Sequence, residues 1–143
     1  MATKSTVIPA LRYRDAHKAI EFLCNGFGFE KQAVYDDEKG GVAHAQLVFG
    51  GGMIMLGSGT HEGEYGRWVQ PPTKDSVTTS GIYMIVRDCD AHYARAKKAG
   101  AVILKEPVDE SYGGRGYSCR DLEGYVWSFG TFDPWAPEVP NST

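Results

Sequence analysis

The second half of this 143-residue chain repeats the pattern of its first half. Each half has an Arg-Asp pair before a helical stretch, a glycine that ends the helix, and three strand-like runs after it. Matching positions lie about 73 residues apart, and they are Asp15 and Asp88, Gly28 and Gly100, and Gly57 and Gly130. A repeat of this length is too long for a solenoid unit. The pattern therefore predicts two copies of one small module, with a functional pocket between them.

The order of elements within each half predicts the fold class. In the first half we expect a strand at 7–13, a helix at 16–27, and strands at 29–36, 42–49 and 53–56. In the second half we expect a strand at 81–86, a helix at 90–99, and strands at 102–108, 115–121 and 125–132. The prediction is one α+β domain of two tandem βαβββ modules that close around a shared concave cleft. Module one spans about 6–57, a linker 58–80, module two 81–132, and an irregular tail 133–143.

Composition excludes several classes of function. Hydrophobic residues make up 42% of the chain and charged residues 23%, which is typical of a globular protein. The net charge of −3 and the scattered basic residues give no reason to expect nucleic acid as a partner. No apolar run approaches the roughly 20 residues of a membrane span, and the start of the chain lacks a signal-peptide core. We therefore expect a cytoplasmic protein with no membrane partner, whose three cysteines are reduced thiols.

One segment of module two adds a specific resemblance. Residues 112–130 read YGGRGYSCRDLEGYVWSFG, with an Asp-x-x-Gly-x-x-x-x-Phe pattern at Asp121, Gly124 and Phe129. With the two Arg-Asp helix openings and the duplicated element order, this segment resembles the glyoxalase / bleomycin-resistance / extradiol-dioxygenase superfamily, also called vicinal oxygen chelate proteins. The resemblance covers residues 6–132 and implies this fold and a homodimer. It implies less about activity, because this fold hosts many functions.

The resemblance also implies a divalent metal held by four side chains, one from the first and one from the last strand of each module. The corresponding positions here are Ile8, Met55, Ile82 and Ser128. Isoleucine has no donor atom, and a neutral thioether or hydroxyl is a poor ligand for Zn, Mg, Mn or Ni. The sequence therefore predicts neither a metal site nor another cofactor, and an apolar floor for the cleft.

The alternation of side chains between the two faces of a strand indicates further residues for that cleft. His44 and Gln46 are two residues apart on one strand, so their side chains lie on one face. The 73-residue offset places Tyr117 and Cys119 at the matching positions, and we expect all four on the concave side. A structural histidine bonded to a backbone or tyrosine partner is the alternative for His44. His17 and His92, in the first turns of the helices, are interpreted as solvated or capping residues, and His61 as an exposed linker residue.

Aromatic and basic residues in two loops complete the candidate site. Trp68 and Tyr65 lie in the linker, and Tyr112 precedes Arg115. The rings can stack on a planar ligand while Arg115 meets a polar or anionic group. Packing of these rings against the body or a dimer partner is the alternative. Trp127 and Trp135 are assigned to core and tail packing. The predicted ligand-binding residues are His44, Gln46, Met55, Trp68, Arg115, Tyr117, Cys119 and Ser128.

Three functions are consistent with this site. The first is metal-free binding of a small aromatic or apolar molecule, such as a drug or antibiotic, in the cleft. The second is a metal-independent isomerase or lyase that uses His44, Tyr117 or Cys119 as an acid or base. The third is an oligomerising or regulatory module without a small-molecule ligand. The first fits the apolar floor best, and the sequence does not name the ligand.

Overall fold

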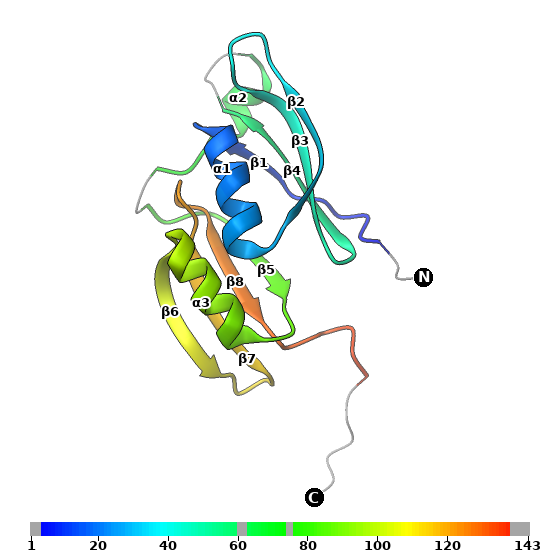
Figure 1. The fold of residues 1–143 in the computed structure, drawn as a ribbon, viewed down its shortest axis with the longest axis vertical. Coiled ribbons are helices and arrows are strands. Elements are labelled where there is room, and N and C mark those ends of the chain that lie inside the picture. Colours follow the sequence, from blue (N-terminus) through cyan, green and yellow to red (C-terminus); the bar gives the residue numbers. More distant parts are fainter. Residues whose placement is uncertain (1–3, 60–62, 74–75, 138–143) are drawn as a thin grey trace, which may run out of the picture.

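A computed structural model of the chain describes residues 4–59, 63–73 and 76–137 (Figure 1). Module one contains β1 (Ala10–Tyr13), α1 (Ala16–Phe22), the π-helical turn η1 (Leu23–Phe27), β2 (Glu30–Asp36), β3 (Val42–Phe49) and β4 (Gly52–Ser58). After α2 (Tyr65–Trp68), module two contains β5 (Ile82–Ile85), α3 (Cys89–Ala99), β6 (Val102–Asp109), β7 (Arg115–Arg120) and β8 (Val126–Gly130). The predicted α+β fold of two tandem βαβββ modules is confirmed.

Each module forms one four-stranded mixed sheet. Sheet one has the strand order β1-β4-β3-β2, and sheet two has the equivalent order β5-β8-β7-β6. The first strand of each module runs parallel to the last, and the other neighbours are antiparallel. Figure 1 shows α1 covering one face of sheet one and α3 covering one face of sheet two.

The two helices begin in the same way and end differently. The Asp15 carboxylate accepts a hydrogen bond from Lys18 N at 3.1 Å, and the Asp88 carboxylate accepts one from Ala91 N at 3.0 Å. Both aspartates are therefore side-chain N-caps. The helix predicted to reach Phe27 stays α-helical only to Phe22, and the wider turns of η1 carry it to Phe27.

The π-helical turn joins the cores of the two modules. The Phe27 ring lies 5.2 Å from the Trp127 ring and 4.7 Å from the Phe129 ring, between ring centroids. All three side chains are almost completely buried. The helix-facing sides of both sheets thus belong to one hydrophobic core. The expected core position of Trp127 is confirmed, whereas Trp135 is 90% exposed and does not pack as expected.

The linker is more ordered than its composition predicts, because residues 65–68 form the short helix α2. His61 lies outside the described residues. In the described part of the chain the longest helix, α3, has 11 residues, and none is long and apolar enough to cross a bilayer.

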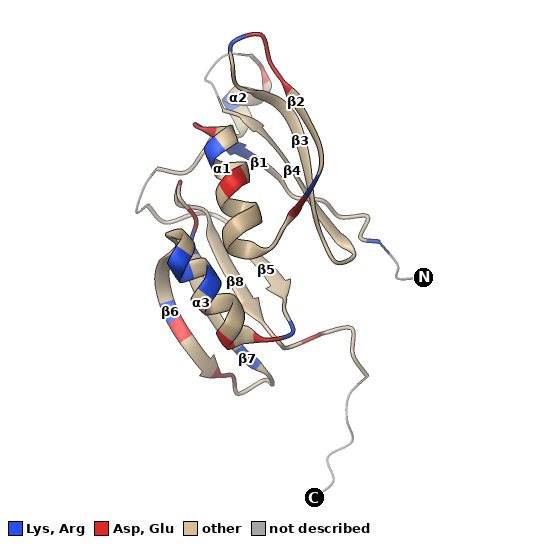
Figure 2. Cartoon of the chain, in the orientation of Figure 1, with Lys and Arg blue, Asp and Glu red and all other residues tan. Residues whose placement is uncertain are grey.

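Four strands of the two sheets carry no charged side chain. Strands β3, β4, β5 and β8 contain no Lys, Arg, Asp or Glu. Figure 2 shows the charges on the helices, the turns and the remaining strands. A site built on these four strands alone is therefore apolar or carries uncharged polar groups, whereas the central strand β7 of sheet two carries Arg115 and Arg120.

Candidate functional site

Each sheet has one face packed against its helix and an opposite face, which we call the open face. Ala45, Leu47 and Ile54 point toward α1 and are at most 3% exposed. Because successive strand residues alternate between faces, the residues between them lie on the open face. The open face of sheet one includes Ala10, Arg12, His44, Gln46, Met53 and Met55, and that of sheet two includes Tyr83, Ile85, Ser118, Val126 and Ser128.

Three predicted site residues lie together on the open face of sheet one. Gln46 is the register partner of Met55, and His44 is two residues away on the same strand. The His44 Nε2 atom lies 2.9 Å from Gln46 Oε1, and Gln46 Nε2 donates to Gln32 Oε1 at 2.6 Å. Because an amide oxygen only accepts, His44 donates from Nε2. The Tyr35 ring stacks on the imidazole with 6.3 Å between centroids.

Tyr117 and Cys119 do not lie on the open face. Four residues (49–52) separate the paired Val48 and Met53, whereas five (121–125) separate the paired Arg120 and Val126. The extra residue shifts the internal correspondence by one in β7, and a shift of one residue exchanges the faces of a strand. Gln46 therefore corresponds to Ser118, not Cys119.

The buried positions of Tyr117 and Cys119 also change their chemistry. They are 2% and 0% exposed and point toward α3. Burial raises the pKa of the Cys119 thiol to about 12 and raises the pKa of Tyr117 as well. Both groups are thus protonated at neutral pH, and neither is placed to act as a base on a ligand.

The predicted cleft floor is corrected at β5. Ile82 is the register partner of the buried Trp127 and lies on the helix side, whereas Tyr83 is the partner of Ser128 on the open face. The Tyr83 hydroxyl donates to Phe132 O at 2.7 Å. The family's metal positions thus hold aliphatic, thioether and hydroxyl groups, which do not fit a divalent cation. Within residues 4–59, 63–73 and 76–137, no three His, Cys, Asp or Glu side chains group closely enough to hold a metal ion.

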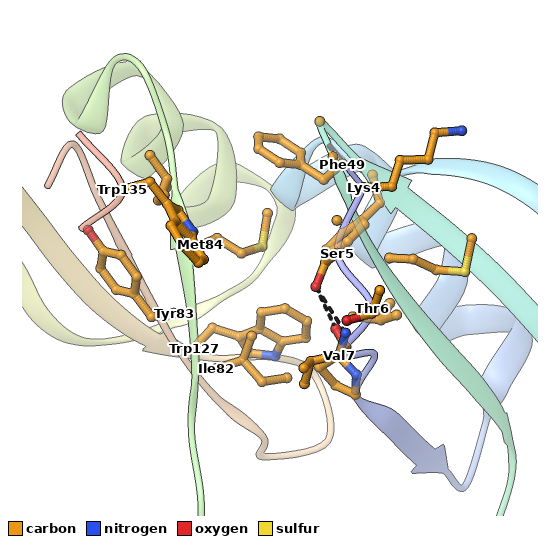
Figure 3. Close-up of a pocket in the computed structure, with 18 residues that line it drawn as sticks. Lys4, Ser5, Thr6, Val7, Phe49, Ile82, Tyr83, Met84, Trp127 and Trp135 are labelled. Carbon is orange, nitrogen blue, oxygen red and sulfur yellow. Dashed lines mark hydrogen bonds between the residues drawn. The ribbon is translucent and has the colours of Figure 1, made fainter. Parts of the chain in front are cut away.

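A hollow of about 1040 Å³ lies at the seam between the modules. We call it the seam groove. Figure 3 shows Trp127, Ile82 and Met84 on one side of it and Phe49 and Val7 on the other. Trp135 and Tyr83 are also in its lining, and Lys4, Ser5 and Thr6 are its main polar residues. An apolar hollow of this size with few polar groups is typical of a small-molecule site.

The remaining predicted residues are dispersed. Trp68 ends α2 and is 69% exposed. Arg115 begins β7, where it donates to Asp90 at 3.0 Å and to Asp109 at 3.4 Å. Ser128 lies on the open face of sheet two, 2.7 Å from Ser118 between hydroxyl oxygens. The structure therefore groups His44, Gln46 and Met55, and it separates Arg115 and Ser128 from them.

A buried carboxylate links the two modules, although in the sequence it stands out only as part of a motif. Asp121 is 2% exposed and accepts hydrogen bonds from the Tyr13 hydroxyl at 2.6 Å and from Trp127 Nε1 at 3.0 Å. The backbone N–H groups of Glu123 and Tyr125 donate to its other oxygen. Burial raises the pKa of Asp121, although these four hydrogen bonds act in the opposite direction. The role is structural, because the carboxylate is buried and four protein donors satisfy its two oxygens.

His92 and Arg95 on α3 hold the end of helix one. His92 Nε2 lies 2.8 Å from Phe27 O and its Nδ1 lies 2.6 Å from the Tyr117 hydroxyl. Arg95 donates to the carbonyl oxygens of Asn25 and Cys24 at 2.7 and 3.1 Å. These are carbonyls that a helix end leaves without intrahelical partners. His92 was expected to be solvated or capping; it links the modules by bonding a helix-end carbonyl, and burial lowers its pKa.

Comparisons with known proteins agree with this architecture. The model of the Glyoxalase/Bleomycin resistance protein/Dioxygenase superfamily matches residues 6–129. An uncharacterized protein of Mycobacterium bovis is 30% identical over 122 residues, which cover 85% of this chain and 80% of the relative. An uncharacterized protein of Mycobacterium tuberculosis is also 30% identical, over 85% of this chain and 71% of its own length.

Solved structures of other proteins have the same fold. TioX from Micromonospora sp. ML1 is 31% identical, with a TM-score of 0.66 over 88% of this chain and 97% of TioX. The fosfomycin resistance protein FosX from Listeria monocytogenes, in complex with Mn(II) and sulfate, has a TM-score of 0.67 at 16% identity, over 93% of this chain and 96% of FosX. The second likeness is one of fold alone. With the duplicated sheets, the Asp121 turn and a family model that matches most of its length, the chain belongs to the glyoxalase/bleomycin resistance protein/dioxygenase superfamily.

Proposed function

We propose that this protein binds a small aromatic or largely apolar molecule without the help of a metal ion. The observation that carries the proposal is the seam groove of about 1040 Å³, whose walls are mainly aromatic and aliphatic. Trp127 and Phe49 supply rings, and Met53 and Met84 supply flexible thioethers that adapt to irregular ligands.

The position of the groove supports the proposal. It adjoins the open face of sheet one along β4, where Met53 lines the groove and Met55 lines a second, smaller pocket. Residues two apart on one strand are about 7 Å from each other. A ligand body in the seam groove therefore reaches the part of the open face that holds His44 and Gln46.

The relatives suggest which molecules to try first. FosX is a fosfomycin resistance protein, and the family name includes bleomycin resistance. We therefore propose a drug or antibiotic with a planar apolar part as the most informative class of ligand. Sequestration, not turnover, is the activity expected of a groove without a metal-ligand set.

Titration of the purified protein with planar aromatic compounds, followed by tryptophan fluorescence, tests the proposal. We expect saturable binding that is the same before and after treatment with EDTA. Trp68→Phe and Trp135→Phe variants separate the signals of these two exposed rings from that of Trp127. Binding that is lost in EDTA and restored by one equivalent of a divalent cation would overturn the metal-free proposal.

A matched pair of variants locates the ligand. Ile85 lines the seam groove and Leu122 does not, yet both side chains are 39% exposed. A charge at either exposed site has a small effect on stability. We expect Ile85→Glu to abolish binding and Leu122→Glu to leave it unchanged. Equal affinities in the two variants would place the ligand elsewhere.

We also propose that the protein is a homodimer. Strand β6 is an edge strand of sheet two and exposes Val102, Leu104 and Val108, which are 52%, 49% and 39% exposed. An unpaired apolar edge favours association with another copy. Light scattering should give about twice the chain mass of 15.7 kDa, and Val102→Lys should shift it toward the monomer. A wild-type monomer at micromolar concentration would contradict the proposal.

The enzymatic alternative rests on His44, since Tyr117 and Cys119 are buried and protonated at neutral pH. His44 is half-buried on the open face, and its Nε2 atom is held by Gln46. Turnover of a bound compound that survives EDTA and is lost in His44→Ala would favour an enzyme. Bound compound recovered unchanged from wild type would favour sequestration.

A further inference from the structure

Trp135 lines the seam groove, yet the residue is 90% exposed. Figure 3 shows its indole on the same side of the groove as Met84 and Tyr83. Trp127 lines the same groove but is 0% exposed, because it is packed in the core. Trp135 is therefore the lining tryptophan whose ring is open to a ligand.

Contacts with module two fix the backbone that carries Trp135. Phe132 O accepts a hydrogen bond from the Tyr83 hydroxyl at 2.7 Å, and the Phe132 ring lies edge-on to the Tyr112 ring with 5.1 Å between centroids. The Asp133 side chain then accepts a hydrogen bond from Trp135 N at 2.8 Å, which forms a short turn. Although Trp135 lies beyond the last strand, these contacts hold it beside the groove.

The indole ring, in contrast, is not engaged. Among the residues that the structure describes, no aromatic ring contacts it and no acceptor receives its N–H. Isolated apolar side chains are common on protein surfaces. Trp135 differs from these because its backbone is fixed at the edge of an apolar groove. A ligand that covers this ring removes a large apolar surface from water, which favours binding.

We infer that Trp135 is a ligand-binding residue that stacks on the face of a planar ring system in the seam groove. The inference rests on the proposed function and narrows its ligand from an aromatic or largely apolar molecule to a planar aromatic one. Aromatic rings that stack with an offset gain free energy beyond the area they bury. A puckered aliphatic ring contacts a flat indole at fewer atoms. The flexible side chains of Met53 and Met84 adapt to either shape, so the selection depends on Trp135.

Two probes with the same carbon skeleton test the inference on the wild-type protein. 2-Naphthol is planar and aromatic, and decahydro-2-naphthol is its saturated, puckered counterpart with the same hydroxyl. The saturated probe has the larger apolar surface, so burial alone does not favour 2-naphthol. Because a stacked aromatic pair adds to the affinity, we expect 2-naphthol to bind roughly 3- to 10-fold more tightly. Isothermal titration calorimetry measures both affinities and needs no fluorescence from the probe.

Variants assign that preference to one ring. Trp135→Leu keeps an apolar side chain without a ring and should remove the preference, whereas Trp135→Phe should keep most of it. Trp68→Leu is the matched control, because Trp68 is also exposed, at 69%, and lines neither the seam groove nor the second pocket. It should bind both probes as wild type does. All three substitutions are at exposed positions, so each variant should fold.

Fluorine NMR of protein labelled with fluorotryptophan reports the contact directly. The chain has three tryptophans, and the signal that is missing from Trp135→Phe belongs to Trp135. Saturating 2-naphthol should shift that signal through the ring current of the bound probe, and it should leave the signal of Trp68 unchanged. A Trp135 signal that stays in place while 2-naphthol is bound would overturn the inference.

The outcomes separate this inference from the proposed function. Wild-type protein that binds decahydro-2-naphthol as tightly as 2-naphthol overturns the inference and leaves the proposed function standing. The same holds for a preference that persists in Trp135→Leu, and if neither probe binds while other aromatic compounds do. If Trp135→Leu binds both probes as wild type does but has half the wild-type mass in light scattering, the ring contacts a second copy and the inference is wrong. If no aromatic or apolar compound binds at all, both proposals fail.

Discussion

The helix-facing sides and the open faces of the two sheets carry side chains of similar types, but these side chains differ in their burial and in their bonding partners. On the helix side, Tyr117, His92 and Asp121 are bonded to one another or to other protein groups. On the open face, Arg12 and His44 line a pocket of about 240 Å³. The type of a residue therefore does not identify a binding site in this fold, because the face of the sheet on which the side chain lies determines whether a ligand can reach it. Open-face changes should alter binding more than stability, whereas helix-side changes should alter stability, and those at residues that line the seam groove, such as Ile82 and Met84, should alter binding as well.

Asp121→Ala should produce the largest loss of stability. The substitution leaves the Tyr13 hydroxyl, the Trp127 indole N–H and two backbone N–H groups without their acceptor. Because these buried donors lose their acceptor, we expect the free energy of unfolding to fall by about 3–5 kcal/mol. Urea unfolding followed by circular dichroism measures it.

The control for this prediction is Asp109→Ala, whose side chain is 88% exposed. An exposed ion pair contributes at most about 1 kcal/mol, so this variant should unfold close to wild type. If Asp121→Ala is as stable as Asp109→Ala, the buried carboxylate does not hold the modules together.

Adjacent residues on β4 give the most direct test of the two faces. Ile54 is 3% exposed and points toward α1, whereas Met55 is half-buried on the open face. Ile54→Ala should cost about 2–4 kcal/mol because it leaves a cavity in the core. Met55→Ala should cost about 1 kcal/mol or less and should weaken binding of an aromatic ligand several-fold. Denaturant unfolding and fluorescence titration measure the two effects, and the reverse result would mean that the faces are wrongly assigned.

His92 should make stability depend on pH. Burial lowers its pKa from the ordinary value of 6.5, so the unfolded chain takes up a proton at a higher pH than the folded chain does. The contribution of His92 to stability is therefore fully present above about pH 6.5 and decreases as the pH falls below that value. Wild type should lose more stability between pH 7 and pH 5 than His92→Gln does, as measured by urea midpoints.

The matching control is His17→Gln. His17 occupies the first turn of the other helix, where it lies 3.0 Å from Asp36 with both side chains at least 49% exposed. This variant should follow the wild-type pH profile. A His92→Gln profile that coincides with that of wild type would show that another group accounts for the pH dependence.

The repeat in the sequence predicted the fold well, because helix caps and strand alternation are local signals. Asp15 and Asp88 mark both helix starts correctly. The site was harder to predict, since one extra residue in the 121–125 connection exchanges the faces of β7 and turns Tyr117 and Cys119 inward. Arg12 was missed because only the fold brings it beside His44, and the seam groove needs the relative placement of two modules. The spacing of residue types along the sequence does not predict the placement of Arg12 beside His44 or the seam groove.

Ser118 and Ser128 should give the smallest effect and show how the open faces of the two modules differ. Their hydroxyls bond to each other at 2.7 Å on a face whose other side chains include Tyr83, Ile85 and Val126. Losing one half-buried hydrogen bond costs about 0.5–1 kcal/mol, so Ser128→Ala should be that much less stable. The double variant Ser118→Ala/Ser128→Ala should be no worse than the single one, because both partners are then removed. Neither should change the affinity for a planar aromatic ligand. An affinity that falls in Ser128→Ala as far as in Met55→Ala would place the ligand on the open face of module two and reverse the assignment of the two open faces.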